Sequence, residues 1–250
     1  MKEGKTRRIP RTRASRHSLN SKARQQKWKL DSDLRMRTFV IADIHGFHQA
    51  FLQCLKKSDF DKNKDRLICL GDACDRGPQI RECIDELLSI RNCAYILGNH
   101  DAWALEWATH RIAPIEWLEQ GGSGTIASYG STGMPKEHIK FLEKAPLWLV
   151  DKNRLFVHAG FNADDGLDKT PKETLIWDRE LIFKAMLLNQ SCPQWKFGGY
   201  DEVFIGHTPT LKLDKTAPVK FCNVWAIDTG ICCHGKLTIM DVDTKEYWQS

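Results

Sequence analysis

Polar residues, most of them of types that bind metal ions, follow short apolar runs at several places in this chain. The side chains at or just beyond the ends of these runs are Asp43, His45, Asp72, Asp75, Arg76, Asn99, His100, His158 and His207. Carboxylates, imidazoles and one carboxamide form a mixed oxygen and nitrogen set, which suits Mn²⁺, Fe or Zn²⁺ better than Mg²⁺ or Ca²⁺. The set holds more ligands than one ordinary site uses, so it predicts two cations that share a bridging carboxylate. Two such cations can clamp the attacking and leaving oxygens of a phosphoryl displacement.

The elements that must position these residues alternate between strand and helix. Short apolar runs bounded by polar residues predict buried strands at 39–42, 67–70 and 94–97. Apolar residues at helical spacing predict helices at 46–57 and 80–90. This alternation is typical of parallel strands in an α/β sheet, in which ligands bind beyond the carboxyl ends of the strands.

Strands and helices are also expected in the rest of the chain, but they alternate less regularly. Residues 101–146 are expected to be mainly helical. Strands are expected at 155–157 and 203–205, and each runs into a histidine. The segments 224–227 and 236–241 predict two further strands that form a hairpin.

Charge is distributed unevenly along the chain. Residues 1–37 contain 13 of the 37 lysines and arginines but only 3 of the 32 acidic residues, whereas residues 38–250 contain 24 basic and 29 acidic residues. Residues 1–37 therefore predict a basic, disordered tail, and residues 38–250 predict a catalytic domain. The mildly acidic body is a poor match to a nucleic-acid-binding domain, which leaves nucleic acid as a ligand for the tail alone.

Hydropathy and cysteine usage bear on the cellular compartment. No apolar run reaches the ~18–20 residues that a membrane helix needs, so no membrane partner is expected. The nine cysteines include no CxxC pair, which argues against a structural zinc knuckle. Their odd number and the lack of a recognisable secretory signal favour reduced thiols in a cytoplasmic protein.

Five short blocks of sequence carry a resemblance to a known family. They are Asp43-Ile44-His45-Gly46, Gly71-Asp72-Ala73-Cys74-Asp75-Arg76-Gly77, Gly98-Asn99-His100-Asp101, His158-Ala159-Gly160 and Gly206-His207. In this order and spacing they resemble the signature blocks of the calcineurin-like metallophosphoesterases. The Asp-Arg-Gly ending of the second block and the segment Asp228-Thr229-Gly230 are similar to the phosphoprotein phosphatase branch, which includes bacterial and phage-lambda-type serine/threonine protein phosphatases. The resemblance covers residues 38–250 and implies an α/β fold, with two mixed β-sheets packed as a sandwich and flanked by helices.

The resemblance also implies a set of metal ligands. The first divalent cation would be held by Asp43, His45 and Asp72, and the second by Asp72, Asn99, His158 and His207. Mn²⁺ is the expected metal, with Fe or Zn²⁺ as alternatives. A water shared by both cations would be acidified toward hydroxide and would attack phosphorus in line.

The same resemblance implies roles for the remaining residues. His100 would protonate the leaving alkoxide, and Asp75 would bind the other ring nitrogen and fix its orientation. Arg76 would grip phosphate oxygens, as would Arg179 in the short match Ile176-Trp177-Asp178-Arg179. Asp101 stands where the eukaryotic enzymes usually have glutamate, a departure that concerns the subfamily more than the chemistry.

These features together predict a metal-dependent phosphomonoester hydrolase, with phosphoserine or phosphothreonine in proteins or peptides as the substrate. One alternative is a symmetrical bis(5′-nucleosyl)-tetraphosphatase, whose signature blocks are nearly the same. Another is a non-catalytic module that works through its basic tail. The full ligand set and His100 argue against that module, because a protein that only binds has no need of them.

Three further motifs have plainer interpretations. The indoles of Trp103, Trp107 and Trp117 are expected to pack in the core rather than stack on nucleotide bases. The glycine-rich stretch 121–124 lacks the lysine of a phosphate-binding loop, so a hinge or loop is expected there. The adjacent pair at 232–233 is expected to be structural, because neighbouring cysteines rarely form a relaxed disulfide.

Overall fold

The structure, a computed structural model, describes residues 36–250. The predicted basic tail therefore lies outside the described residues, except for Met36 and Arg37. Within the described part of the chain, no helix combines the length and apolar character needed to cross a membrane.

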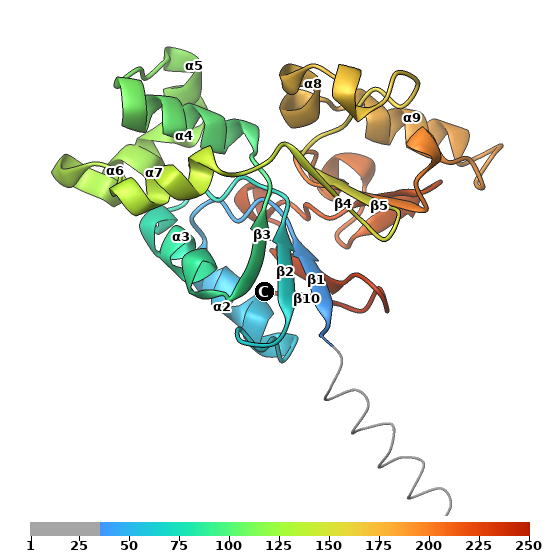
Figure 1. The fold of residues 1–250 in the computed structure, drawn as a ribbon, viewed down its shortest axis with the longest axis horizontal. Coiled ribbons are helices and arrows are strands. Elements are labelled where there is room, and N and C mark those ends of the chain that lie inside the picture. Colours follow the sequence, from blue (N-terminus) through green and yellow to red (C-terminus); the bar gives the residue numbers. More distant parts are fainter. Residues whose placement is uncertain (1–35) are drawn as a thin grey trace, which may run out of the picture. The chain divides into compact units, whose positions relative to one another are not determined.

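Two five-stranded sheets form the centre of residues 37–250 (Figure 1). The strand order of the first sheet is β10 (Tyr247–Gln249), β9 (Thr238–Asp241), β1 (Thr38–Ile41), β2 (Arg66–Cys69) and β3 (Asn92–Tyr95). The order of the second is β4 (Trp148–Asp151), β5 (Arg154–Val157), β6 (Glu202–Ile205), β8 (Val224–Ala226) and β7 (Val219–Phe221). Both sheets are mixed, because parallel central strands are bordered by antiparallel partners.

Helices cover the outer faces of both sheets. The main helices are α2 (His48–Lys57), α3 (Ile80–Ser89), α4 (Asn99–His110), α5 (Ile115–Trp117), α6 (Ser123–Tyr129), α7 (Lys136–Glu143), α8 (Lys172–Trp177) and α9 (Glu180–Leu188). One apolar cluster joins the first sheet to α2, α3 and the group α4–α7, and a second joins the other sheet to α8 and α9. The helical group α4–α7 is inserted between β3 and β4.

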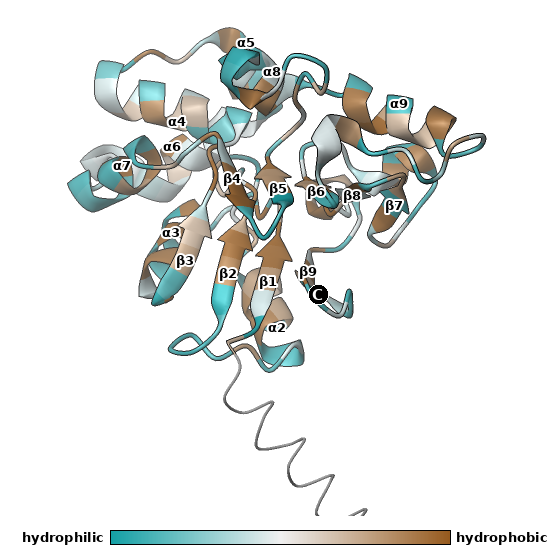
Figure 2. Cartoon of the chain, turned by 45° about the vertical axis from the view of Figure 1, so that its right-hand side comes forward, coloured by the Kyte–Doolittle hydropathy of each residue, from teal (hydrophilic) through white to brown (hydrophobic). Residues whose placement is uncertain are grey.

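A third apolar cluster fills the space between the two sheets. Val40 and Ala42 point into it, whereas Phe39 and Ile41 of the same segment point toward the helices. Side chains of a strand alternate between its two faces, so a strand that is buried on both faces needs an unbroken apolar run. Figure 2 shows the result as mainly brown strands between helices that alternate between teal and brown. The predicted α/β sandwich is confirmed.

The connection after β8 differs from the prediction. The parallel pairing of β1, β2 and β3 agrees with the alternating pattern. The predicted hairpin between 224–227 and 236–241 is wrong, because β8 pairs with β6 and β7 in the second sheet while β9 pairs with β1 and β10 in the first. Proximity in sequence favours a hairpin, but β8 and β9 each extend a different buried sheet.

The inter-sheet cluster provides a test of the packing. Phe156 and Phe204 stack face to face there, with ring centroids 4.9 Å apart. We expect Phe204→Ala to lower the free energy of unfolding by about 3–5 kcal/mol, because it opens a cavity between the sheets. Chemical denaturation measures the loss. Leu187→Ala, at a side chain that is 64% exposed on α9, should change stability by no more than about 0.5 kcal/mol, and equal losses at the two sites would contradict the sandwich core.

Candidate active site

The carboxyl ends of parallel strands from both sheets meet at one place. Each strand end supplies one of the predicted ligands: Asp43 after β1, Asp72 after β2, Asn99 after β3, His158 after β5 and His207 after β6. His45 follows two residues after Asp43. All six side chains are buried, with exposures of 5% or less. The structure therefore brings together residues from five separate sequence blocks.

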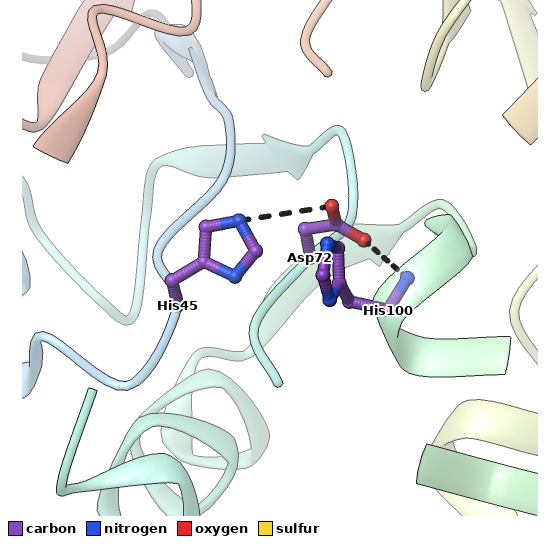
Figure 3. A group of neighbouring side chains, drawn as sticks. All are labelled: His45, Asp72 and His100. Carbon is purple, nitrogen blue, oxygen red and sulfur yellow. Dashed lines mark hydrogen bonds and ion pairs between the residues drawn. The ribbon is translucent and has the colours of Figure 1, made fainter. Parts of the chain in front are cut away.

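Asp72 lies at the centre of this cluster (Figure 3). Its Oδ2 is 3.8 Å from His45 Nε2 and 3.4 Å from His158 Nε2. Its Oδ1 accepts a hydrogen bond from the backbone N–H of His100 at 3.0 Å. One carboxylate thus contacts residues from both halves of the predicted ligand set.

Two overlapping groups of donor atoms share Asp72. The first contains His45, Asp72 and His100, and the second contains Asp72, His158 and His207. In each group the donor atoms lie within 4.8 Å of one another. Asp43 belongs to neither group as the side chains stand, since its carboxylate accepts the backbone N–H of His207 at 3.0 and 3.2 Å.

The hydrogen bonding of the imidazoles fits a metal site. Nδ1 of His45 bonds the carbonyl of Cys74, and Nδ1 of His158 bonds the carbonyl of Leu70, both at 2.7 Å. Such bonds fix the ring with a proton on Nδ1, so that in the neutral imidazole the lone pair of Nε2, the nitrogen that faces Asp72, is available to a metal ion. Nε2 of His207 and Nδ2 of Asn99 are buried without a hydrogen-bond partner among the described residues. A buried polar atom without a partner is costly, and a cation at this place would give His207 one.

The electrostatics of the cluster also favour cation binding. Burial lowers the pKa of His45 to about 3 and that of His207 to about 2, so both imidazoles are neutral, as metal ligands must be. Burial together with the nearby carboxylate of Asp228 raises the pKa of Asp43 well above its usual range. Burial acts to raise the pKa of Asp72 as well, but the charge of His158 outweighs it and holds that pKa well below the usual range. Burial acts to lower the pKa of His158, but the carboxylates of Asp72 and Asp43 outweigh that effect and raise it to about 9.

Left-handed backbone conformations are concentrated in this site. Positive φ angles occur at Asp43 (49°), His45 (47°), Asp72 (54°), Asp75 (71°), Arg76 (69°) and His207 (61°). Residues other than glycine rarely adopt this conformation, and such outliers gather at functional sites. Hydrogen bonds between the β1 and β2 loops hold the strained segments, including Asp43 N–H to Gly71 O at 3.1 Å and His45 N–H to Asp72 O at 2.9 Å.

His100 and Asp75 form a hydrogen-bonded pair beside the cluster. Nδ1 of His100 is 2.6 Å from Oδ2 of Asp75, the contact that the sequence predicts. Nε2 of His100 faces the guanidinium of Arg76 at 3.2 Å. The imidazole therefore has one nitrogen fixed by a carboxylate and the other directed toward the guanidinium of Arg76.

A cleft of about 80 Å³ joins these groups. Arg76 and Arg179 both line it, together with the predicted ligands Asp43, His45, Asp72, Asn99 and His207. One amino group of Arg179 donates to the carbonyl of His207 at 3.0 Å and to Thr208 Oγ1 at 3.2 Å. The two arginines, about 100 residues apart in sequence, thus border the same opening.

Several residues at the cleft were not singled out from the sequence. Asp228 follows β8 and is 4% exposed, and the rule that selected the other strand-end carboxylates would have selected it too. Lys212, Cys232 and Cys233 also line the cleft, and Arg76 donates to the sulfur of Cys232 at 3.6 Å. The cysteine pair therefore borders the site. All nine cysteines are free thiols.

Asp101 has a supporting role that the sequence did not reveal. Its buried carboxylate accepts hydrogen bonds from three consecutive backbone N–H groups of the β2 loop, those of Asp72 (2.7 Å), Ala73 (3.1 Å) and Cys74 (3.2 Å). It also accepts the hydroxyl of Tyr95 at 2.7 Å and the N–H of Gly98 at 3.1 Å. This carboxylate therefore fixes the backbone that carries Asp72.

Comparison with known proteins agrees with this geometry. The profile of the calcineurin-like phosphoesterase family matches residues 36–234. The chain is 28% identical to serine/threonine-protein phosphatase 1 of Salmonella typhimurium, over 80% of this chain and 89% of that protein. It is 32% identical to a symmetrical bis(5′-nucleosyl)-tetraphosphatase of Coxiella burnetii, over 71% of this chain and 62% of that protein. A solved structure described as a candidate diadenosine tetraphosphatase has the same fold, with a TM-score of 0.64 at 16% identity, over 87% of this chain and 94% of the other.

The hydrogen bonds of Asp101 generate a prediction. In Asp101→Asn, one carboxylate oxygen becomes an amide NH₂, which cannot accept the backbone N–H groups of the β2 loop. We expect a loss of about 1–3 kcal/mol in unfolding free energy, the cost of a buried donor without a partner, together with a lower metal content. Asp164→Asn, at an exposed loop residue, serves as the matched control. Calorimetry and elemental analysis measure both effects, and an Asp101→Asn protein with parental stability and metal content would exclude this role.

Proposed function

This chain belongs to the calcineurin-like phosphoesterase family, and from that premise we propose that residues 38–250 form a catalytic domain that hydrolyses phosphomonoesters, with phosphoserine and phosphothreonine in proteins as the substrates. The observation that carries the proposal is the single cleft that joins the Asp72-centred cluster to the His100–Asp75 pair and to both arginines. Phosphoester hydrolysis uses each of these parts.

Two divalent cations fit the ligand set. Asp72 is common to both donor groups, which is the position of a bridging ligand. The other ligands would be Asp43 and His45 on one side and Asn99, His158 and His207 on the other. When bound, cations of this kind supply the Lewis acidity that activates water and stabilises the charge of the transferring phosphoryl group. The mixed donor set favours Mn²⁺, with Fe or Zn²⁺ as alternatives.

The leaving oxygen needs a proton, and His100 is placed to give it. Asp75 holds Nδ1 of His100 at 2.6 Å, so Nε2 is the nitrogen that faces the cleft. An imidazole titrates near neutral pH, which suits a general acid. Arg76, now 3.2 Å from Nε2, would turn its donors to the phosphate when substrate enters and leave Nε2 free to carry the proton.

Arg76 and Arg179 would bind the phosphate. Both line the cleft, and guanidinium groups offer paired donors that match phosphate oxygens. Two arginines and two cations suit a compact phosphomonoester dianion.

The protein-substrate hypothesis has two supports. The similarity to the Salmonella phosphatase extends over 89% of that protein. A groove of about 590 Å³ is also lined by Asn99, Trp103 and Trp177, and its charged lining residues are Glu106, Glu143, Glu173 and Lys172. A polypeptide flanking the phosphorylated residue could lie there, and its basic side chains would complement the glutamates.

One observation favours the symmetrical tetraphosphatase as a second candidate. Lys212 lines the cleft as a third cationic side chain, beyond the two arginines that a monoester requires. A polyphosphate carries further negative charges that Lys212 could neutralise. The tetraphosphatase relative of Coxiella supports the same alternative.

Metal removal tests the proposed centre. We expect chelation followed by dialysis to abolish hydrolysis of an aryl phosphate, and Mn²⁺ to restore it best. Asp72→Asn should reduce activity and metal content more than His45→Asn or His207→Asn, because Asp72 contacts both donor groups. Asp164→Asn is again the control. Full activity of the metal-free protein would rule out the two-cation mechanism.

Direct competition tests the substrate. At equal concentration with Mn²⁺, a phosphoserine peptide should be hydrolysed with higher kcat/KM than diadenosine tetraphosphate. Lys212→Ala should leave kcat/KM for the peptide within about twofold, and should lower the weaker activity on the tetraphosphate by up to about tenfold, the effect of ~1.4 kcal/mol. Preferential cleavage of the dinucleotide, with release of two ADP, would assign the chain to the tetraphosphatases instead.

A further inference from the structure

The segment from α5 to α6 contacts the His100–Asp75 pair through Asp75. It contains Trp117, Gly121, Gly122 and Thr125, and the helical path is kinked at Gly121, whose φ is +109°. Trp117 and Thr125 are fully buried, so neither side chain reaches the substrate.

Both side chains bind the carboxylate of Asp75. The indole Nε1 of Trp117 donates to Oδ2 at 2.7 Å, and the hydroxyl of Thr125 donates to Oδ1 at 2.5 Å. The same hydroxyl accepts the backbone N–H of Asp75 at 3.0 Å. Asp75 is 0% exposed, so the bonds from Trp117, Thr125 and His100 stand in place of water around its carboxylate.

The kink at Gly121 also approaches the backbone of Arg76. The carbonyl of Gly121 accepts the N–H of Arg76 at 3.0 Å. A Cβ at Gly121, whose φ is +109°, would lie 2.8 Å from the backbone nitrogen of Arg76, and one at Gly122 would lie 2.4 Å from the indole of Trp117. Only glycine permits these two approaches, so this stretch, which was expected to be a hinge or loop, packs closely against Arg76 and Trp117.

We propose that Trp117 and Thr125 are positioning residues that act on His100 through Asp75. By donating to both carboxylate oxygens, they fix the plane of the carboxylate and stabilise its charge. The remaining acceptor site on Oδ2 then points at Nδ1 of His100, which directs Nε2 into the cleft. The inference rests on the proposed function in one respect, that His100 supplies the proton to the leaving group.

A purely structural role for the two residues makes a different prediction. Trp117 packs on Trp107, with ring centroids 6.0 Å apart, so its replacement disturbs the core in any case. A packing defect would affect all substrates alike. A misaligned His100 would affect only those whose leaving group needs a proton.

The experiment compares Trp117→Phe and Thr125→Val with His100→Asn as the reference. Each protein is assayed, with Mn²⁺, on a phosphoserine peptide and on p-nitrophenyl phosphate, whose leaving group needs no proton. We expect Trp117→Phe and Thr125→Val to lower kcat for the peptide by about 10–100-fold, the usual range for a supporting hydrogen bond, and to lower that for the aryl phosphate much less. KM for both substrates should change little.

Two matched variants separate positioning from packing. Trp107→Phe removes an indole from the same cluster without touching Asp75, and it should not alter the ratio of the two activities. Thr125→Ser keeps the hydroxyl and should recover most of the activity that Thr125→Val loses. In an Asp75→Asn background, Trp117→Phe should cause little further loss of kcat, because residues that act as one unit are not additive.

A spectroscopic readout is independent of catalysis. In the Zn²⁺-loaded protein, the Nδ1 proton of His100 should give a downfield ¹H resonance that His100→Asn lacks. Trp117→Phe and Thr125→Val should shift or abolish it, whereas Trp107→Phe should keep it. If His100→Asn slows both substrates equally, the general-acid role fails, but the resonance still tests the positioning. If Trp117→Phe and Thr125→Val behave like Trp107→Phe in both assays, the inference is overturned.

Discussion

The carboxylate of Asp72 is buried to 1% exposure where the ends of the two sheets meet, and the surrounding site offsets the cost of keeping it there. Removing a carboxylate from water costs several kcal/mol unless charges and hydrogen bonds compensate. The imidazole of His158 and the backbone N–H of His100 provide part of this compensation. Asp43 and Asp228 add negative charge to the same small volume, and burial raises the pKa of Asp228 to about 6. Carboxylates and imidazole nitrogens are thus confined to a small buried volume, an arrangement that is consistent with a metal site.

Backbone strain is a second constraint at the Asp72 site. Six site residues adopt left-handed conformations, each of which costs roughly 1–2 kcal/mol for a residue with a Cβ. Such a conformation turns the chain sharply at the strand end, so that the side chain points back over the sheet. The strain persists because other interactions determine the loop, above all the five hydrogen bonds that Asp101 accepts. The apolar cluster between the sheets, in which Phe156 and Phe204 stack, contributes stability that offsets part of this cost.

The parallel strands and the candidate ligands were predictable because both carry local signals: a buried strand followed by a donor residue is visible in the chain itself. The two-sheet sandwich and the His100–Asp75 contact carry no such signal and were expected only from the resemblance of the sequence blocks to the family. Asp228 carries the local signal too and was missed only as a site residue. The partners of Trp117 and Thr125 were beyond prediction, because each lies more than 40 residues away at Asp75 and depends on a loop conformation. The hairpin prediction was wrong for the same reason: β9 pairs with β1, a strand that lies far from it in the sequence, and no local pattern reveals that pairing.

The site residues come from two parts of the fold, the sandwich and the helical group α4–α7. Four of the predicted metal ligands follow β1, β2, β5 and β6, and so belong to the rigid sandwich, together with His45. The insertion supplies Asn99 and His100 at the start of α4, the two donors on Asp75, and the groove residues Trp103 and Glu106. The residues of this insertion that border the site can therefore change while the other five candidate ligands stay in place. The chain is similar both to a serine/threonine-protein phosphatase and to a symmetrical bis(5′-nucleosyl)-tetraphosphatase, and one fold can carry different functions.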